Sequence, residues 1–187
     1  TGDPVESMAR RLTDTASRHG IDQIGLDRIE SAFRTALQYR ASCSERDPAL
    51  LHPARTILIL LEDSAVTDVD VLSAAALAES ENPALAVPRE RVQEQFNARV
   101  AELTQAVPWP AQCDDQLLET LLAADPDAQR IALAERLDHA RHLHLSPTAD
   151  WAAMHRIVLE SYLPVAERLD QVLGRRLRWW CSMFERR

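Results

Sequence analysis

Glycine is scarce in this chain, which has only four glycines in 187 residues. Strand-rich folds need glycine in many of their tight turns. The sequence also lacks any sustained alternation of apolar and polar residues, the pattern of a half-buried strand. Hydrophobic residues make up 46% of the chain, which is enough for a sizeable core at this length. We therefore expect an all-α fold in a single domain.

The spacing of apolar residues predicts the first two helices. Residues 5–19 and 24–40 repeat apolar side chains at helical intervals, and His19-Gly20 is a suitable end for the first helix. The apolar stripe expected on the second helix consists of Ile24, Ile29, Phe33, Ala36 and Leu37.

Two more helices are expected before the middle of the chain. Pro48 and Pro53 lie at the entry to a helix that runs to about Glu62, and Asp68 is a suitable N-cap for a helix that ends near Ala78. The residues of the third helix that we expect to be buried are Ile57, Leu58, Leu60 and Leu61.

The second half of the chain also has a helical pattern. Pro88 opens one continuous helix to about Ala106. Gly174 either interrupts or begins the last helix of the chain. The later helices are expected at about residues 113–123, 127–144, 149–169 and 171–186.

Charge and composition exclude several classes of partner. The net charge of −8 leaves no broad cationic surface for nucleic acid or an anionic membrane. No apolar run approaches the about 20 residues of a membrane span, and residues 1–4 are too polar and acidic for a signal peptide. The missing initiator methionine suggests a fragment. We expect a cytoplasmic protein with reduced thiols at Cys43, Cys113 and Cys181.

Residues 131–141 read Ile-Ala-Leu-Ala-Glu-Arg-Leu-Asp-His-Ala-Arg. This segment resembles the one that supplies the last metal ligand in the HD hydrolase domain of the RelA/SpoT family, whose members make and degrade the alarmone (p)ppGpp. The family's segment runs roughly Leu-Ala-Asp-Arg-Leu-His-Asn-Met-Arg, with its Asp on the metal. Glu135 stands at that ligand position, and His139 stands where the family has Asn.

The resemblance continues on both sides of this segment. Residues 160–169, Glu-Ser-Tyr-Leu-Pro-Val-Ala-Glu-Arg-Leu, are similar to the family's Glu-Ile-Tyr-Ala-Pro-Leu-Ala-Asn-Arg-Leu. Leu51-His52-Pro53 is similar to the family segment that carries the first metal-binding histidine, which implies that role for His52. The motifs span roughly residues 30–187, and they imply an HD-domain-like helical bundle.

The family's paired His-Asp ligands are missing from this chain. Leu77 and Ala78 stand at the aligned positions, and neither side chain offers a lone pair to a metal. We expect Leu77 to fill the former site and to pack against Leu133 and Leu137. This loss favours an inactive (p)ppGpp-hydrolase-like HD domain without a metal cofactor, with a structural or regulatory role in alarmone (stringent response) metabolism.

The remaining donors allow an alternative function. His139 follows Glu135 by four residues, so both can face one ion on the same side of a helix. Together with His52 they would rebuild a site for Mn²⁺ and make the chain a (p)ppGpp 3′-pyrophosphohydrolase. Glu81 and Asn82 stand where the resemblance places carboxylates that handle the attacking water, so they are the candidate catalytic remnants.

Each of these residues also has a purely structural interpretation. Glu135 can instead form an ion pair with Arg55 or Arg141, and Glu81-Asn82 can serve as a loop cap before Pro83. A further functional alternative is a sensor that binds guanine nucleotide without cleaving it.

The C-terminal residues 174–187 are basic and aromatic, and in the resembling proteins this helix leads into the alarmone synthetase domain. The chain is therefore expected to be one HD-like domain over residues 1–187, or the N-terminal part of a longer alarmone synthetase. The expected partners are a linked or separate (p)ppGpp synthetase domain, or a second copy in a homo-oligomer.

Overall fold

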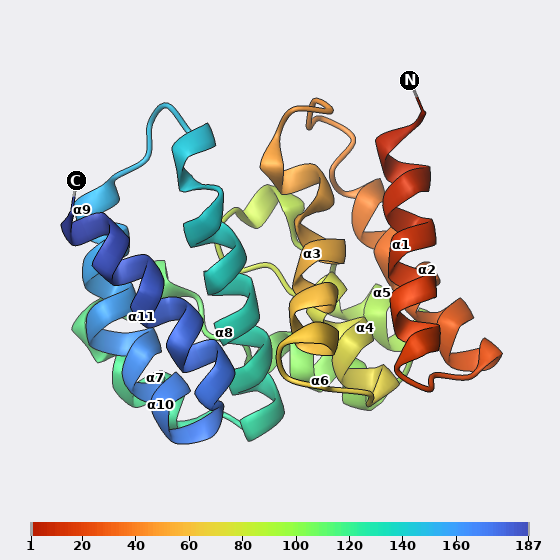
Figure 1. The fold of residues 1–187 in the computed structure, drawn as a ribbon. Helices are drawn as coiled ribbons and strands as arrows, with labels where there is room; N and C mark the ends of the chain where they lie inside the picture. Colours follow the sequence, from red (N-terminus) through yellow and green to blue (C-terminus); the bar gives the residue numbers. More distant parts are fainter. Residues whose placement is uncertain (1, 187) are drawn as a thin grey trace.

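The computed structural model describes residues 2–186, which fold as an all-α bundle without any strand in that range (Figure 1). The all-α prediction is confirmed. Thr1 of the polar N-terminal segment and Arg187 of the basic C-terminal segment lie outside the described residues. None of the described helices has both the length and the apolar character needed to cross a bilayer.

Aspartate N-caps explain where the N-terminal helices begin. Side chains of Asp3, Asp22, Asp47 and Asp68 each accept a hydrogen bond from a backbone N–H in the first turn of the following helix. Gly20, with φ of +87°, follows the first helix as predicted. The four helices are α1 (Pro4–Arg18), α2 (Gln23–Gln38), α3 (Pro48–Glu62) and α4 (Val69–Leu77).

The predicted apolar stripes are largely confirmed. The four α3 residues expected to be buried are buried, and so are Ile29, Phe33 and Ala36 of α2, while Leu37 packs against the core from a partly buried position. The prediction that Ile24 belongs to the buried stripe of α2 is wrong, because its side chain is 74% exposed. It lies in the first turn of the helix, where Gly25 occupies the buried position instead.

The prediction of one continuous helix from Pro88 to Ala106 is wrong, because the helix is broken in its middle. The chain forms α5 (Arg89–Gln95) and α6 (Ala98–Ala106), with a break at Phe96 and Asn97. The Asn97 side chain accepts a hydrogen bond from the backbone N–H of Val100 and donates one to Asp70 in α4. A residue that caps a new helix in this way competes with continuation of the old one.

The C-terminal helices differ from the predictions mainly at their ends. The range 113–123 contains a 3₁₀ turn before α7, the range 127–144 ends its α-helix at Arg141, and the range 149–169 contains a π-helical turn. Pro164, just after that turn, lacks the N–H that would hold the preceding turn in α geometry. The elements are α7 (Leu117–Ala123), α8 (Pro126–Arg141), α9 (Trp151–Ile157), η5 (Val158–Tyr162), α10 (Leu163–Leu169) and α11 (Gln171–Glu185).

Helix α8 lies between the two halves of the bundle (Figure 1). It contacts α3, α4 and α6 of the N-terminal half and α10 and α11 of the C-terminal half. Nearly every residue from Ala128 to Ala140 is therefore buried, as expected for a helix enclosed on all sides. This enclosure places the polar residues of α8 inside the protein.

Gly174 neither interrupts nor begins α11 but lies buried within it. A methyl group at this position would meet the backbone nitrogen of Glu167 at 3.5 Å, an ordinary contact, whereas a methyl group at Gly25 would lie 2.5 Å from Ile21 Cγ2 and 2.9 Å from Val69 Cγ2. Glycine is therefore required sterically in α2 but not in α11.

This contrast gives a paired stability prediction. Helix propensity alone favours alanine over glycine by about 1 kcal/mol. We expect Gly174→Ala to keep or gain stability and Gly25→Ala to lose about 1–3 kcal/mol through overpacking, as measured by urea denaturation. Equal stabilisation by both substitutions would contradict the close packing of α2 against Val69.

Candidate functional site

Three of the charged side chains of α8 are withdrawn from solvent. Glu135, Arg136 and Asp138 are exposed by only 1%, 2% and 2%, respectively. A buried charge is tolerated when it is paired or hydrogen-bonded. Most of the partners that matter to the candidate site come from α3 and from the loop that follows α4, and Arg136 also contacts Tyr162 of η5.

His52, Glu135 and His139 meet at the interface of α3 and α8. One potential ligand atom from each lies within 4.8 Å of the others. Glu135 Oε1 is 3.9 Å from His52 Nε2 and 3.5 Å from His139 Nε2. The two imidazole rings are stacked with their centroids 4.1 Å apart. The structure thus brings together the three residues that the sequence suggests as remnants of a metal site.

Each of these residues also carries a buried polar atom without a hydrogen bond. The atoms are His52 Nε2, Glu135 Oε2 and His139 Nε2. Such atoms are rare in folded proteins and point to a missing water, ion or ligand. A set of two imidazole nitrogens and one carboxylate suits a divalent transition metal such as Mn²⁺, Fe²⁺, Co²⁺ or Zn²⁺. The donors present therefore fit a metal ion.

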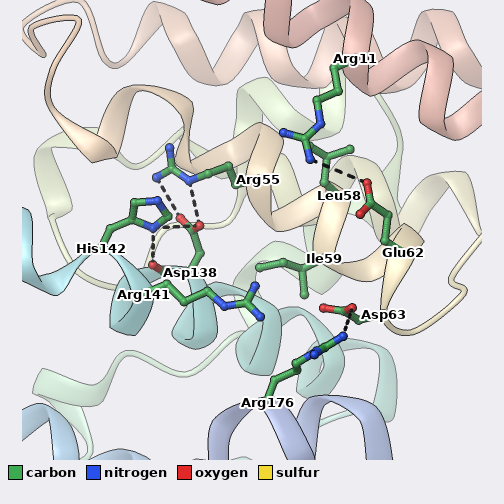
Figure 2. A pocket seen from close by; sticks show the side chains of 10 residues that line it. All are labelled: Arg11, Arg55, Leu58, Ile59, Glu62, Asp63, Asp138, Arg141, His142 and Arg176. Carbon is green, nitrogen blue, oxygen red and sulfur yellow. Dashed lines mark hydrogen bonds and ion pairs between the residues drawn. The ribbon is translucent and has the colours of Figure 1, made fainter. Parts of the chain in front are cut away.

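Asp138 orients His52 from the side opposite Glu135. His52 Nδ1 donates a hydrogen bond to Asp138 Oδ2 at 2.6 Å, so Nε2 is the nitrogen that faces Glu135 and His139. Arg55 holds the same carboxylate through two hydrogen bonds of 2.8 and 3.0 Å, and His142 lies 3.3 Å from it (Figure 2). A carboxylate behind a histidine fixes the ring orientation at many metal sites.

Glu135 is positioned by the loop after α4. The backbone N–H and the hydroxyl of Ser80 both donate to Glu135 Oε1, at 3.0 and 2.7 Å. The other oxygen, Oε2, is left free. The expected alternative of an ion pair between Glu135 and an arginine is wrong, because Arg55 holds Asp138 and Arg141 has no hydrogen bond or ion pair within residues 2–186.

The same loop is fixed by a buried ion pair. Arg40 at the end of α2 donates to Glu79 at 2.9 Å, and both side chains are almost fully buried. The other Glu79 oxygen accepts hydrogen bonds from the backbone N–H groups of Glu81 and Asn82. These contacts set the path of the loop and therefore the position of Ser80.

Glu81 and Asn82 differ in their relation to the site. Glu81 forms an ion pair with the buried Arg136, which also donates to the Tyr162 hydroxyl at 3.3 Å. Asn82 is exposed and caps the short 3₁₀ helix at Pro83–Leu85, so the loop-cap interpretation holds for Asn82. The catalytic roles expected for both residues stay predictions.

A cavity of about 200 Å³ gives access to the site. Its wall includes His52, His139, Asp138 and Arg55, and Glu81 also reaches it. Glu81 thus faces the same space as the two histidines, whereas Asn82 does not contribute to the wall.

The electrostatics of the cluster distinguish the two histidines. Burial alone would lower the pKa of His52, but the hydrogen bond to Asp138 and the nearby Glu135 carboxylate outweigh it and raise the pKa of His52 to about 9. Burial and the neighbouring His52 cation lower the pKa of His139. Burial opposes ionisation of Glu135, yet the two neighbouring histidines, His139 foremost, hold the pKa of Glu135 below its usual value. At neutral pH without metal, His52 is therefore the histidine of the pair that carries a proton more readily.

Leu77 and Ala78 are both buried, each with 3% exposure, and belong to the same hydrophobic core as Leu133 and Leu137. They offer no donor atom to the site. Their burial agrees with the expectation, whereas direct packing of Leu77 against Leu133 and Leu137 stays a prediction.

No protein-family model matches the chain, and no curated protein matches it either. The interpretation of the site rests on its own geometry and on the sequence motifs.

The buried position of Leu77 and Ala78 gives a stability prediction. We expect the double substitution Leu77→His and Ala78→Asp to lower the melting temperature of metal-free protein by about 5–10 °C, because a buried imidazole and carboxylate would lack partners. Leu77→Met, which nearly conserves volume, is the control and should cost less than about 1.5 kcal/mol. An unchanged melting temperature in the double variant would mean that these positions are not enclosed.

Proposed function

We propose that this chain is an HD-like domain of the RelA/SpoT type that binds one divalent metal ion through His52, Glu135 and His139 and hydrolyses (p)ppGpp at its 3′-pyrophosphate. The observation that carries the proposal is the convergence of two buried imidazole nitrogens without hydrogen-bond partners on the Glu135 carboxylate, whose Oε2 also has none among the described residues. The RelA/SpoT motifs supply the substrate class.

The proposed chemistry needs a metal, a base and a cavity. A divalent ion held by His52, Glu135 and His139 would keep open positions, and it would supply the activation of a water and the polarisation of a phosphoryl oxygen. Glu81 lines the adjoining cavity and is paired with Arg136, so it can accept the proton of the attacking water. Asp138 and Ser80 hold two of the ligands in place.

A second candidate function is a domain that regulates a (p)ppGpp synthetase without hydrolysing the alarmone. Two observations favour it. Leu77 and Ala78 remove two of the ligands that the resemblance implies, and the cavity of about 200 Å³ is smaller than the roughly 300–1,000 Å³ typical of small-molecule sites. A nucleotide would enter only if the cavity widened. In this alternative the chain binds a synthetase domain or a guanine nucleotide and does no chemistry.

Metal binding tests the centre that the first function requires. We expect one Mn²⁺ per chain by calorimetry and elemental analysis, lost in His52→Ala and in His139→Ala. His144→Ala is the matched control, because His144 is exposed on the 3₁₀ turn after α8. Binding that survives both substitutions at His52 and His139 would place the ion elsewhere.

The affinity for metal should also depend on pH in a defined direction. Because the pKa of His52 is raised to about 9, metal must displace a proton from it at lower pH. We expect the affinity to rise by up to about tenfold per pH unit between pH 7 and 9, with about one proton released per ion in buffers of different ionisation enthalpy. His139 adds little in this range, because its pKa is lowered.

Hydrolysis separates the two candidate functions. With Mn²⁺ present, we expect pyrophosphate release from ppGpp and a loss of about 100-fold or more in Glu81→Gln with metal binding retained. Asn82→Ala should retain activity, since Asn82 does not line the cavity. Bound metal without any pyrophosphate release would favour the regulatory function, and ppGpp binding measured in parallel would identify a sensor.

A further inference from the structure

A second cavity, of about 220 Å³, lies behind the candidate metal centre. Residues from α1, α3, α8 and α11 form its walls (Figure 2). Arg55, Asp138 and His142 line both cavities. The Asp138 carboxylate is therefore a shared wall, with His52 on one side and the second cavity on the other.

Four arginines converge on this second cavity from four different helices. Arg55 is committed to Asp138. Among residues 2–186, the acidic neighbours of Arg11 and Arg176 are Glu62 at 4.0 Å and Asp63 at 3.7 Å, both beyond hydrogen-bond reach.

Arg141 has no hydrogen bond or ion pair within residues 2–186. Figure 2 shows its side chain extending toward the side of the cavity where Asp63 and Arg176 lie. Its guanidinium donors are thus available to a ligand.

The charges around the cavity leave a positive excess. Its lining has four arginines and three carboxylates, so the arginines outnumber the carboxylates by one. The protein as a whole carries a net charge of −8, so the charge of this cavity lining has the opposite sign to that of the whole chain. Arg55 and Asp138 neutralise each other, which leaves Arg11, Arg141 and Arg176 facing Glu62 and Asp63.

The geometry points to a binding site for a phosphoryl anion in this cavity, separate from the metal centre. Guanidinium groups bind phosphate oxygens as planar forks, and the cavity's volume suits a phosphate or pyrophosphate group without a nucleoside. Free phosphate, free pyrophosphate and the phosphoryl group of a small metabolite share this chemistry. Arg141 and Arg176 are the residues that we assign to the anion.

The shared wall couples this site to the proposed function. An anion in the second cavity adds negative charge next to Asp138. This charge favours a metal ion at His52 Nε2, on the side of the ring away from Asp138. We expect the anion to tighten Mn²⁺ binding several-fold, and Mn²⁺ to tighten anion binding by the same factor. This coupling rests on the proposed metal centre, whereas the anion site does not.

The anion site is tested in metal-free protein, dialysed after chelation, by calorimetric titration with phosphate and with pyrophosphate. Sulfate in a third titration reports whether any tetrahedral dianion suffices. We expect one anion per chain, with affinity at least tenfold weaker in the double variant Arg141→Gln and Arg176→Gln. The matched control, Arg168→Gln and Arg175→Gln, removes the same charge from exposed positions of α10 and α11 and should bind as the parent does.

Three outcomes overturn the anion site: no binding of any of the three anions at millimolar concentration, full binding in the double variant, or equal weakening in the control. Arg141→Lys keeps the charge but not the fork, and it should still weaken binding. The metal titration is then repeated with and without phosphate in the parent and in the double variant. Failure of Mn²⁺ to bind would refute the metal centre but leave the anion titrations intact, so the two failures are distinguishable.

Discussion

The hydrogen bond between His52 and Asp138, at 2.6 Å, joins α3 to α8 at the point on which the rest of the site depends. It fixes which imidazole nitrogen faces Glu135, and it gives a buried carboxylate one of its partners. Arg55 and His142 complete the surroundings of Asp138. Without this contact, Asp138 would be a buried charge short of a partner, which is strongly destabilising.

A bound metal would also offset the free-energy cost of burying Glu135. An enclosed helix that carries Glu135, Arg136 and Asp138 needs compensation for each charge. Arg136 has Glu81 and Tyr162, and Asp138 has Arg55. Glu135 receives only two hydrogen bonds from Ser80 on one oxygen, and the other oxygen has none. A cation between Glu135 and the two histidines would interact with the polar atoms that have no hydrogen bond among the described residues.

The sequence predicted the fold better than the site. Proline and aspartate located the starts of α3, α4 and α5, because both act locally. The break at Asn97 and the π-helical turn before Pro164 depend on tertiary contacts and helix geometry that no local pattern contains. The sequence motifs indicated His52, Glu135 and His139 as candidate metal ligands. It did not reveal Asp138, Ser80 or Arg40, whose roles arise only when α3, α8 and the loop after α4 meet. The i,i+3 spacing of Glu135 and Asp138 on one helix was the available signal for Asp138.

The enclosed position of α8 makes the bundle indivisible. The N-terminal half buries its apolar surface against one side of this helix, and the C-terminal half buries its own against the other. A chain cut on either side of α8 would leave one half without the surface that closes its core. Insertions and loop exchanges can therefore be accommodated only where the chain is exposed, as at residues 114–116 before α7. We therefore expect the metal ligands and both cavities to be lost together when the bundle unfolds.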